Sequence, residues 1–305
     1  MPSSSRLVSV VLLSYNRPEY LRESLESLLR QSYANLQITV IDNPSRASAE
    51  VARIVNRHRR VKLIQNPANL GYAGGMNRGL AQADGHYVFL TEDDIVLKSD
   101  CIERLVQCLE AEASVALVAP IIYNKREQTI RCAGGDFTLG AVYRMKIHGA
   151  GEQDTGQFPE PFDVGYIDGA AMFARKDFWQ RYGGFRAEYF MYVEAVELCA
   201  RVGRSGQRMM VVPAAKVYHF EPLERATPPE IEFHKVKNFF SLYLLHAPAR
   251  HLPEFVCRYA VLNTARTLMG RTVNTPRAFL KALLWVAGKT PSLLKERYRK
   301  RSYSN

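Results

Sequence analysis

The first 120 residues alternate between two hydrophobic patterns. Residues 7–13 (LVSVVLL) form a nearly continuous apolar run, as expected for a strand buried on both faces. Pro18 then opens a stretch whose leucines share one helical face. The same patterns predict strands at 36–41, 61–64, 87–90 and 115–123, and helices at 47–59, 76–83 and 99–112. Strands that alternate with helices of this length predict βαβ units, and therefore an α/β fold with a mainly parallel sheet.

The second part of the chain is less regular. Residues 124–165 are rich in Gly and Pro and predict either a long active-site loop or a small β insert. Beyond them the pattern predicts strands at 166–175, 208–212 and 216–219, and helices at 176–182 and 194–205. The prolines between 222 and 229 mark a boundary, so we expect a main domain at 1–230 and a helical tail at 231–305.

The charge of the chain is concentrated in this tail. Residues 231–305 hold 14 Lys and Arg against 3 Asp and Glu, which accounts for the whole formal charge of +11. Apolar runs at 239–245 and 279–286 are interleaved with these cations, which is typical of basic amphipathic helices on an anionic membrane surface. The alternative is a helical pair packed on the main domain with a solvated basic face. Nucleic acid is not an expected partner, because no DNA- or RNA-reading module occurs.

Two other observations narrow the class of protein. The five cysteines are odd in number and form no C-x-x-C pair, so we expect reduced thiols rather than disulfides or a structural zinc site. The apolar run at 7–13 is far shorter than the ~20 residues of a membrane span, and no other run reaches that length. We therefore expect a cytoplasmic protein, peripheral at the inner face of the cell membrane.

Polar residues follow four of the predicted strands, where each strand ends. Because ligands bind beyond the carboxyl ends of strands in an open parallel sheet, these clusters should converge on one cleft. The clusters are Ser14, Tyr15, Asn16 and Arg17; Asp42 and Asn43; Asn66 to Gly71; and Thr91, Glu92, Asp93 and Asp94. Four such turns describe a polar binding cleft better than four independent capping turns.

Two of the clusters suggest specific ligands. Three adjacent acids, Glu92, Asp93 and Asp94, repel one another, and carboxylates select hard cations such as Mg²⁺ or Mn²⁺. The alternative is an acidic capping turn. The Gly-rich segment 69–77 (NLGYAGGMN) could cradle a phosphate with its backbone amides, or simply permit tight helix packing. Neither G-x-G-x-x-G nor a Walker A motif occurs, so dinucleotide and P-loop chemistry are unsupported.

The order of these motifs resembles the family-2 glycosyltransferases with the GT-A fold, and especially their rhamnosyltransferase-like branch. The resemblance extends over about residues 7–245. It rests on 8–17 (VSVVLLSYNR), 40–43 (VIDN), 69–77, 92–94 (EDD), 169–172 (GAAM), 183–185 (GGF), and 194–201 leading to 217–219 (VYH).

The resemblance implies a UDP- or dTDP-sugar donor and a saccharide or polyprenyl-linked acceptor. Asp42 matches the acid that contacts the base, and Asp93 matches the ribose and diphosphate side. Asp94 matches the metal ligand, Glu92 stands where the family often has Asp or Asn, and His219 matches a histidine near the metal. The other matched donor-side residues are Ser14, Tyr15, Asn16, Arg17, Asn43, Asn69, Gly71, Gly74 and Asn77. A bound Mn²⁺ or Mg²⁺ would stabilise the leaving diphosphate, and a carboxylate would take the proton of the attacking hydroxyl, with inversion.

One position departs from the family pattern. The late helix of the family begins Glu-Asp, and that Asp is the expected base, but here Glu194 is followed by Ala195. Glu194, Glu197 or Asp168 could act as a displaced base, with Glu194 ranked first. Glu197 is also placed to pair with Arg201 at i+4, and Asp168 could be a strand-end cap.

Two other functions compete with a metal-dependent inverting transferase. The chain could be a degenerate domain that binds a nucleotide sugar without turnover, because Ala195 replaces the expected base. A nucleotidyltransferase is the weaker option, because that class usually has a Gly-rich basic loop after the first strand. Trp179, Tyr189 and Phe190 could form a platform for a sugar ring or could simply pack in the core.

Overall fold

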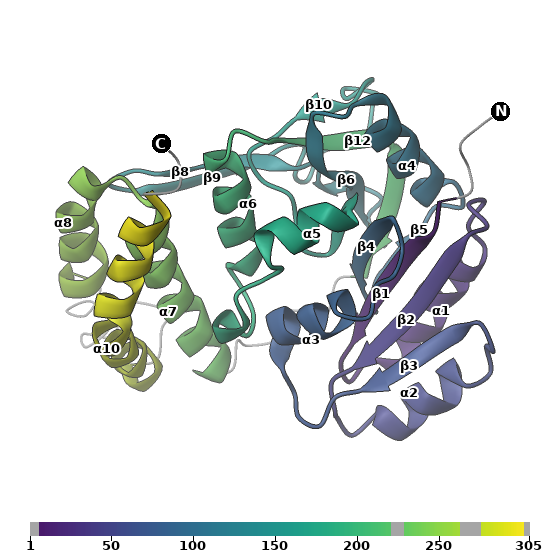
Figure 1. Cartoon of the computed structure of the whole chain (residues 1–305), viewed down its shortest axis with the longest axis horizontal. Coiled ribbons are helices and arrows are strands. Elements are labelled where there is room, and N and C mark those ends of the chain that lie inside the picture. Colours follow the sequence, from purple (N-terminus) through teal and green to yellow (C-terminus); the bar gives the residue numbers. More distant parts are fainter. Residues whose placement is uncertain (1–5, 221–228, 263–275, 302–305) are drawn as a thin grey trace.

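The computed structural model describes residues 6–220, 229–262 and 276–301. Ten strands in this part of the chain form one mixed sheet with the order β10-β12-β6-β11-β4-β1-β2-β3, in which β5 pairs with β12 and β7 with β6 (Figure 1). The strands are β1 (Val8–Ser14), β2 (Leu36–Asp42), β3 (Val61–Gln65), β4 (Tyr87–Glu92), β5 (Ile95–Leu97), β6 (Val115–Asn124), β7 (Ile130–Cys132), β10 (Phe162–Asp163), β11 (Ala171–Arg175) and β12 (Arg208–His219).

The first four strands are parallel to one another, as the alternation of strands and helices predicts. β1 is buried along its whole length and pairs with β2 on one side and β4 on the other. In this register Ser14 stands opposite Asp42, and Leu13 stands opposite Glu92. The carboxyl ends of the three strands therefore meet at one edge of the sheet.

Helices connect and cover the strands. They are α1 (Pro18–Leu29), α2 (Ser48–Val55), α3 (Gly71–Leu80), α4 (Cys101–Ala111), α5 (Lys176–Tyr182) and α6 (Glu194–Arg204). Helix α3 packs on β1 and β2 through glycines. A Cβ atom on Gly75 would lie 2.4 Å from the Leu13 side chain, and one on Gly79 would lie 2.1 Å from that of Val11. The missing side chains bring the N-terminus of α3 close to the end of β1.

Several boundaries differ from the expectation. The Gly-rich segment already belongs to α3, which begins at Gly71 rather than at residue 76. The strands expected at 208–212 and 216–219 are one strand, β12, with a register shift between Val212 and Lys216. Of the strand expected at 166–175, only residues 171–175 form a strand, which is β11. The short strand β5 is not among the expected strands. Residues 124–165 form the small β insert, which includes the hairpin of β8 (Gly135–Leu139) and β9 (Tyr143–Ile147).

The C-terminal part of the described chain is helical and has a small core of its own. It contains α7 (Pro229–His246), η2 (Ala249–His251), α8 (Leu252–Phe255), the π-helical segment η3 (Val256–Leu262) and α10 (Pro276–Arg301). These helices lie beside α6 and the end of the β8–β9 hairpin (Figure 1). Tyr143 of the hairpin packs edge-on against Phe239, and Leu242 of α7 joins the main core. Packing on the main domain, one of the two alternatives for the tail, is therefore observed, and membrane contact stays a prediction.

The described helices include none with the length and apolarity needed to cross a bilayer.

Candidate functional site

The acidic turn and the turn after β1 lie together at the carboxyl edge of the sheet. The backbone N–H of Tyr15 donates to Oδ2 of Asp93 over 2.9 Å. The guanidinium of Arg17 donates to Oδ2 of Asp94 and lies 3.8 Å from Oδ1 of Asp93. Asp93 and Asp94 are 3% and 1% exposed, so this pair of carboxylates is almost entirely removed from water. The structure thus brings the first and fourth polar clusters together.

His219, at the end of β12, faces the same acids. Its Nε2 atom lies 3.7 Å from Oδ1 of Asp94, and its Nδ1 atom has no hydrogen-bond partner. Oδ1 of Asp94 is also buried without a hydrogen-bond partner. Burial lowers the pKa of His219, which favours the neutral imidazole that can donate a lone pair to a metal. The unpartnered Oδ1 of Asp94, an oxygen ligand of the kind that Mg²⁺ and Mn²⁺ prefer, therefore faces Nε2 of the imidazole.

The third expected ligand, Glu92, is not part of this pair. Across the described residues, no three His, Cys, Asp or Glu side chains are grouped closely enough to form a metal site by themselves. Burial, followed by the charge of Asp94, raises the pKa of Glu92 well above its usual range. Burial and Asp94 also raise the pKa of Asp93 to about 7. An added cation would relieve this crowding of acids, and Mg²⁺ is commonly held by one or two carboxylates completed by substrate phosphates.

The two polar residues at the end of β2, Asp42 and Asn43, have different environments. Asp42 is fully buried, and its Oδ2 accepts a hydrogen bond of 3.2 Å from Gln65, whereas Oδ1 has no partner. Asn43 donates to the carbonyl of Gly71 and accepts from the side chain of Asn66 and the backbone N–H of Leu70. Asn43 therefore holds the loop before α3, and Asp42 keeps a free oxygen for a ligand.

The Gly-rich segment is held in the same way. The side chain of Asn69 accepts a hydrogen bond of 2.9 Å from the N–H of Gly71, which has a φ of +66°. A Cβ atom at Gly71 would lie 2.4 Å from the Phe190 carbonyl oxygen, so only glycine fits. Further along α3, both polar atoms of the Asn77 amide bind the backbone of Phe185. Asn77, one of the predicted donor-side residues, thus fixes the segment that follows α5.

The start of α6 carries a buried carboxyl group. Oε2 of Glu194 has no hydrogen-bond partner, and burial, with a contribution from Asp168, raises the pKa of Glu194 to about 7. Ala195 is 7% exposed and offers no polar atom at the position of the expected base. Oδ1 of Asp168 accepts the N–H of Ala170 over 2.9 Å, which is the capping role considered for it, while its Oδ2 lies 3.4 Å from the hydroxyl of Tyr166.

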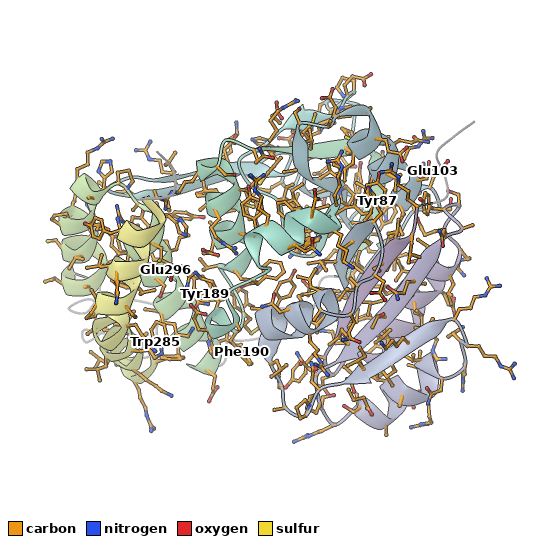
Figure 2. All side chains as sticks on the ribbon, viewed as in Figure 1. Tyr87, Glu103, Tyr189, Phe190, Trp285 and Glu296 are labelled. Atoms are coloured by element: carbon orange, nitrogen blue, oxygen red, sulfur yellow. The ribbon has the colours of Figure 1, made fainter. Side chains whose placement is uncertain are left out.

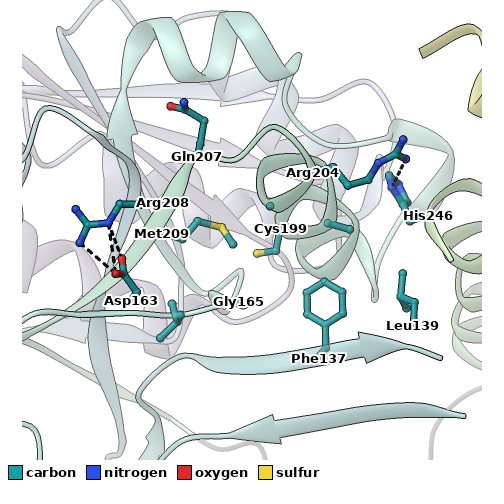
Figure 3. A pocket seen from close by; sticks show the side chains of 13 residues that line it. Phe137, Leu139, Asp163, Gly165, Cys199, Arg204, Gln207, Arg208, Met209 and His246 are labelled. Carbon is teal, nitrogen blue, oxygen red and sulfur yellow. Dashed lines mark hydrogen bonds and ion pairs between the residues drawn. The ribbon is translucent and has the colours of Figure 1, made fainter. Parts of the chain in front are cut away.

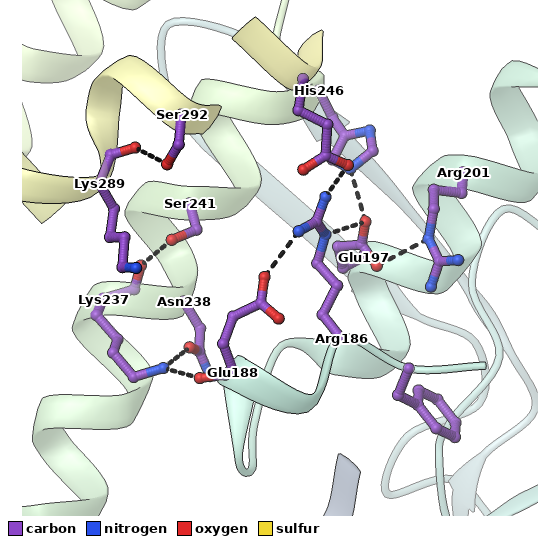
Figure 4. A network of polar contacts seen from close by, with 12 residues as sticks. Arg186, Glu188, Glu197, Arg201, Lys237, Asn238, Ser241, His246, Lys289 and Ser292 are labelled. Atoms are coloured by element: carbon purple, nitrogen blue, oxygen red, sulfur yellow. Dashed lines mark hydrogen bonds and ion pairs between the residues drawn. The ribbon is translucent and has the colours of Figure 1, made fainter. Parts of the chain in front are cut away.

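Glu197, the third candidate base, is surrounded by cations (Figure 4). Its carboxylate binds Arg201 at 2.9 Å, as the i+4 spacing predicts, together with Arg186 at 3.2 Å and His246 at 3.0 Å. Burial alone would raise its pKa, but the hydrogen bond from His246 and the charges of both arginines outweigh burial and hold the pKa at about 2. Glu197 therefore joins α6 to α7, and Arg186 extends the network to Glu296 of α10.

Two further features bear on the site. Trp179 and Tyr189 are 5% and 0% exposed, so they pack in the interior, the second of the two roles considered for them. A pocket of about 400 Å³ lies between the β8–β9 hairpin and α6 and is lined partly by Phe137, Arg204 and His246 (Figure 3). None of the predicted site residues lines this pocket, so the candidate site is the cluster of polar residues at the strand ends.

Two polar residues of α7 were not predicted from the sequence, although they bind the turn that precedes α6 (residues 188–193). Lys237 and Asn238 are 2% and 0% exposed and bind backbone carbonyls of residues 188–192. The only signal in the sequence is that these two polar residues immediately precede the apolar run at 239–245.

The sequence profile of glycosyl transferase family 2 matches residues 9–181 of the chain. The N-acetylglucosaminyl-diphospho-decaprenol L-rhamnosyltransferase of Mycobacterium tuberculosis is 25% identical over 233 residues, which cover 70% of this chain and 76% of the relative. An uncharacterized glycosyltransferase of Haemophilus influenzae is 29% identical over 143 residues. That match covers 46% of this chain and only 44% of the relative's length.

Solved structures show the same fold. GalNAc-T7 with UDP, GalNAc and Mn²⁺ superposes with a TM-score of 0.66 at 15% identity, covering 95% of this chain and 58% of the other. The mannosyltransferase PcManGT of Pyrobaculum calidifontis, in complex with GDP-Man and Mn²⁺, gives a TM-score of 0.57 at 16% identity and covers 99% and 82%. The expected GT-A fold is therefore confirmed.

Proposed function

The chain belongs to glycosyl transferase family 2, and from this premise we propose that it is a metal-dependent, inverting glycosyltransferase. The donor is a UDP- or dTDP-sugar, and the acceptor is a saccharide or a polyprenyl-linked sugar of the cell envelope. The observation that carries the proposal is the unpartnered Oδ1 of Asp94, buried beside Arg17 and His219 at the carboxyl edge of the sheet. The rhamnosyltransferase relative, named for a decaprenol-linked substrate, supports an acceptor of the lipid-linked class.

The donor occupies the cleft formed by the ends of β1, β2 and β4. Oδ1 of Asp42 is buried and unpartnered, which suits a hydrogen bond from the N–H of a pyrimidine base. Tyr15 is 48% exposed beside the acidic turn and can contact the nucleoside. Arg17, already at the acids, can turn its remaining guanidinium donors towards the diphosphate.

Asp94 and His219 would hold the divalent cation, with the diphosphate completing its ligands. A bound Mn²⁺ or Mg²⁺ supplies positive charge that stabilises the diphosphate as it leaves. Both solved neighbours contain Mn²⁺ together with a nucleotide or nucleotide sugar, which supports this choice of ion for the present chain.

Glu194 is the proposed general base. The acceptor hydroxyl attacks the anomeric carbon from the face opposite the diphosphate, and its proton passes to the carboxylate of Glu194 as the new glycosidic bond forms. A pKa near 7 suits a base at neutral pH, and the free Oε2 is available to accept the proton. Asp168 is the second candidate, whereas the carboxylate of Glu197 is committed to Arg186, Arg201 and His246.

The tail is proposed to hold the enzyme at the inner face of the cell membrane, near a lipid-linked acceptor. On α10, Leu280 and Leu284 are 40% and 75% exposed, and Lys281 lies between them on the exposed face. Exposed leucines flanked by cations suit an anionic lipid surface.

A transfer assay tests the proposal. Purified full-length chain is incubated with Mn²⁺, a polyprenyl diphosphate-linked N-acetylglucosamine acceptor and either dTDP-rhamnose or one of several UDP-hexoses, and glycosylated lipid is detected by mass spectrometry. Product that depends on Mn²⁺ and disappears in Glu194→Gln is expected. Nucleotide binding without product from any donor would contradict an active transferase.

Ala195 favours a second candidate, a nucleotide-sugar-binding domain without turnover. In this case Ala195→Asp creates or raises transfer. A wild type that is active, and an Ala195→Asp variant with the same turnover, would exclude a domain that only binds the nucleotide sugar.

A further inference from the structure

The segment that leads into α6 has an unusual backbone. Phe190, Tyr192 and Val193 have φ angles of 63°, 67° and 70°, and they are three of the five non-glycine residues with positive φ in the described ranges. Such conformations are strained for residues other than glycine and persist only where the surroundings impose them. Val193 is β-branched, which makes its positive φ a clear outlier. Because Val193 is the N-cap of α6, this strained turn sets the direction in which Glu194 leaves the backbone.

One side chain of the tail binds most of this turn. Nδ2 of Asn238 lies 2.8 Å from the carbonyl oxygen of Tyr189, 3.0 Å from that of Met191 and 2.8 Å from that of Tyr192. Asn238 is fully buried, and its Oδ1 accepts a hydrogen bond of 2.7 Å from Lys237. Each polar atom of the amide therefore has a partner, and the two N–H groups of Nδ2 are shared among three carbonyls. Figure 4 shows the contact between Lys237 and Asn238.

The neighbouring carbonyls of the turn are also occupied. Lys237 donates to the carbonyl oxygen of Glu188, and the N–H of Ala73 in α3 donates to that of Phe190 over 3.0 Å. The carbonyl of Val193 accepts the N–H of Glu197 inside α6. Every carbonyl from 188 to 193 is thus bound, and α7 supplies the donors for four of the six.

Aromatic packing fixes the same turn. The ring of His234 in α7 stacks on that of Phe190, with centroids 4.6 Å apart. Figure 2 shows Tyr189 and Phe190 between α3 and the C-terminal helices. Lys237 also lies 4.8 Å from the ring centroid of Trp285, which ties this contact to α10. Residues 188–193 therefore contact helix α3 and the tail helix α7, and they lead directly to the candidate base Glu194.

We infer that Asn238 is a positioning residue: through the strained turn 189–193 it orients the start of α6, so that the tail forms part of the catalytic architecture. The inference rests on the proposed function only in taking Glu194 as the base. Without the amide, three carbonyls lose a buried donor and the positive-φ conformations lose their support.

The test compares Asn238→Ala with Ser241→Ala. Ser241 lies one turn further along α7, is buried and donates 2.8 Å to the carbonyl of Lys237, but has no hydrogen bond to the turn. In Asn238→Ala, hydrogen–deuterium exchange of the amides in 188–197 should be about tenfold faster than in wild type, with little change in 101–111. Ser241→Ala should match wild type in both segments. Equal exchange of 188–197 in the two variants would overturn the inference.

A kinetic measurement separates positioning from a general loss of stability, because a purely structural role would not change the pH midpoint of kcat. With the donor that supports turnover, kcat of Asn238→Ala should fall about tenfold at an unchanged donor KM, and the pH midpoint of kcat should shift. An unchanged kcat and midpoint would count against positioning. Hydrogen–deuterium exchange does not require turnover, so its result stays interpretable even where the proposed function fails.

If Asn238→Ala does not fold, Asn238→Asp keeps the shape and the acceptor for Lys237 but removes the donors. The wild type offers a further check, because the side-chain N–H signals of Asn238 should exchange slowly in an NMR spectrum and be absent from the Asp variant. Fast exchange of these signals in folded wild type would overturn the inference.

Discussion

The Nε2 atom of His219 lies 3.7 Å from Oδ1 of Asp94, while the guanidinium of Arg17 binds Oδ2 of the same carboxylate. One carboxylate thus has a cation on one oxygen and a neutral imidazole facing the other. In the proposed site, Arg17 would compete with a metal for Asp94 and would also offer hydrogen-bond donors to a nucleotide diphosphate.

Arg17→Gln should therefore have effects of opposite sign on two ligands. Removing the positive charge beside Asp94 should tighten the binding of Mn²⁺ alone by about threefold to tenfold, because the two cations repel. The same change should weaken UDP binding in the presence of Mn²⁺, because a charge-assisted hydrogen bond is lost. Titration calorimetry measures both, and Arg22→Gln, on the helix that follows Arg17, is the control. Weaker Mn²⁺ binding in Arg17→Gln would contradict the competition.

The rate of transfer should depend on the protonation of Glu194. Burial, with Asp168, raises its pKa to about 7, and a general base must be ionised. The rate should therefore fall about tenfold per pH unit below 7 and level off above it. Glu194→Gln should abolish transfer, while Asp168→Asn should retain most of it. A rate that is flat from pH 5.5 to pH 8.5, or loss of activity only in Asp168→Asn, would assign the base elsewhere.

Glu197 should contribute to stability rather than to catalysis. Its folded pKa of about 2 lies below the unfolded value of about 4.3, so the unfolded state binds more protons between these values. The contribution is complete above the unfolded pKa and is lost as pH falls towards 2. Glu197→Gln also removes the carboxylate that the partly buried Arg186 and Arg201 share.

Denaturant unfolding checks this role of Glu197. At pH 7, Glu197→Gln should lower the free energy of unfolding by about 3 kcal/mol, and the difference should shrink at pH 3. The matched control is Glu26→Gln, which removes an exposed i,i+4 pair with Arg30 and should cost about 0.5 kcal/mol or less. Similar losses in the two variants would refute the buried network as a source of stability.

Membrane contact through α10 should depend on its exposed leucines. Leu284→Glu should weaken sedimentation with anionic vesicles about tenfold, because it removes buried apolar area and adds a negative charge. Leu29→Glu alters a leucine that is 38% exposed on α1 and should leave binding unchanged. Equal vesicle binding by wild type and Leu284→Glu would exclude this face.

Much of the polar cluster at the strand ends could be predicted from sequence because it follows from local pattern. The apolar run ending at Ser14 and the acids after β4 each mark a strand end, and parallel strands bring such ends to one edge. Individual roles could not be read in this way. Asn43 and Asn77 carry the same amide chemistry as a ligand-binding residue, but the structure gives their hydrogen bonds to the protein backbone.

The turn before α6 was less predictable because its contacts are distant in sequence. Asn238 reaches Tyr189 across nearly fifty positions, and no periodicity within α7 reveals that partner. The early start of α3 has a different cause. Glycines are poor helix formers, so the pattern placed the start at residue 76, yet the close approach to Leu13 and Val11 requires them inside the helix.

Titration calorimetry of UDP and dTDP, each with and without Mn²⁺, tests the central claim most directly. The wild type, Asp94→Ala and His219→Ala are compared, with Asp84→Ala, an exposed residue outside the cleft, as the control. The account predicts that Mn²⁺ strengthens the binding of one nucleotide at least about tenfold, and that this gain is lost in both site variants and kept in Asp84→Ala. Nucleotide affinity that does not depend on Mn²⁺ would contradict a metal-dependent donor site at Asp94 and His219. So would an Mn²⁺-dependent gain in affinity that is kept in Asp94→Ala.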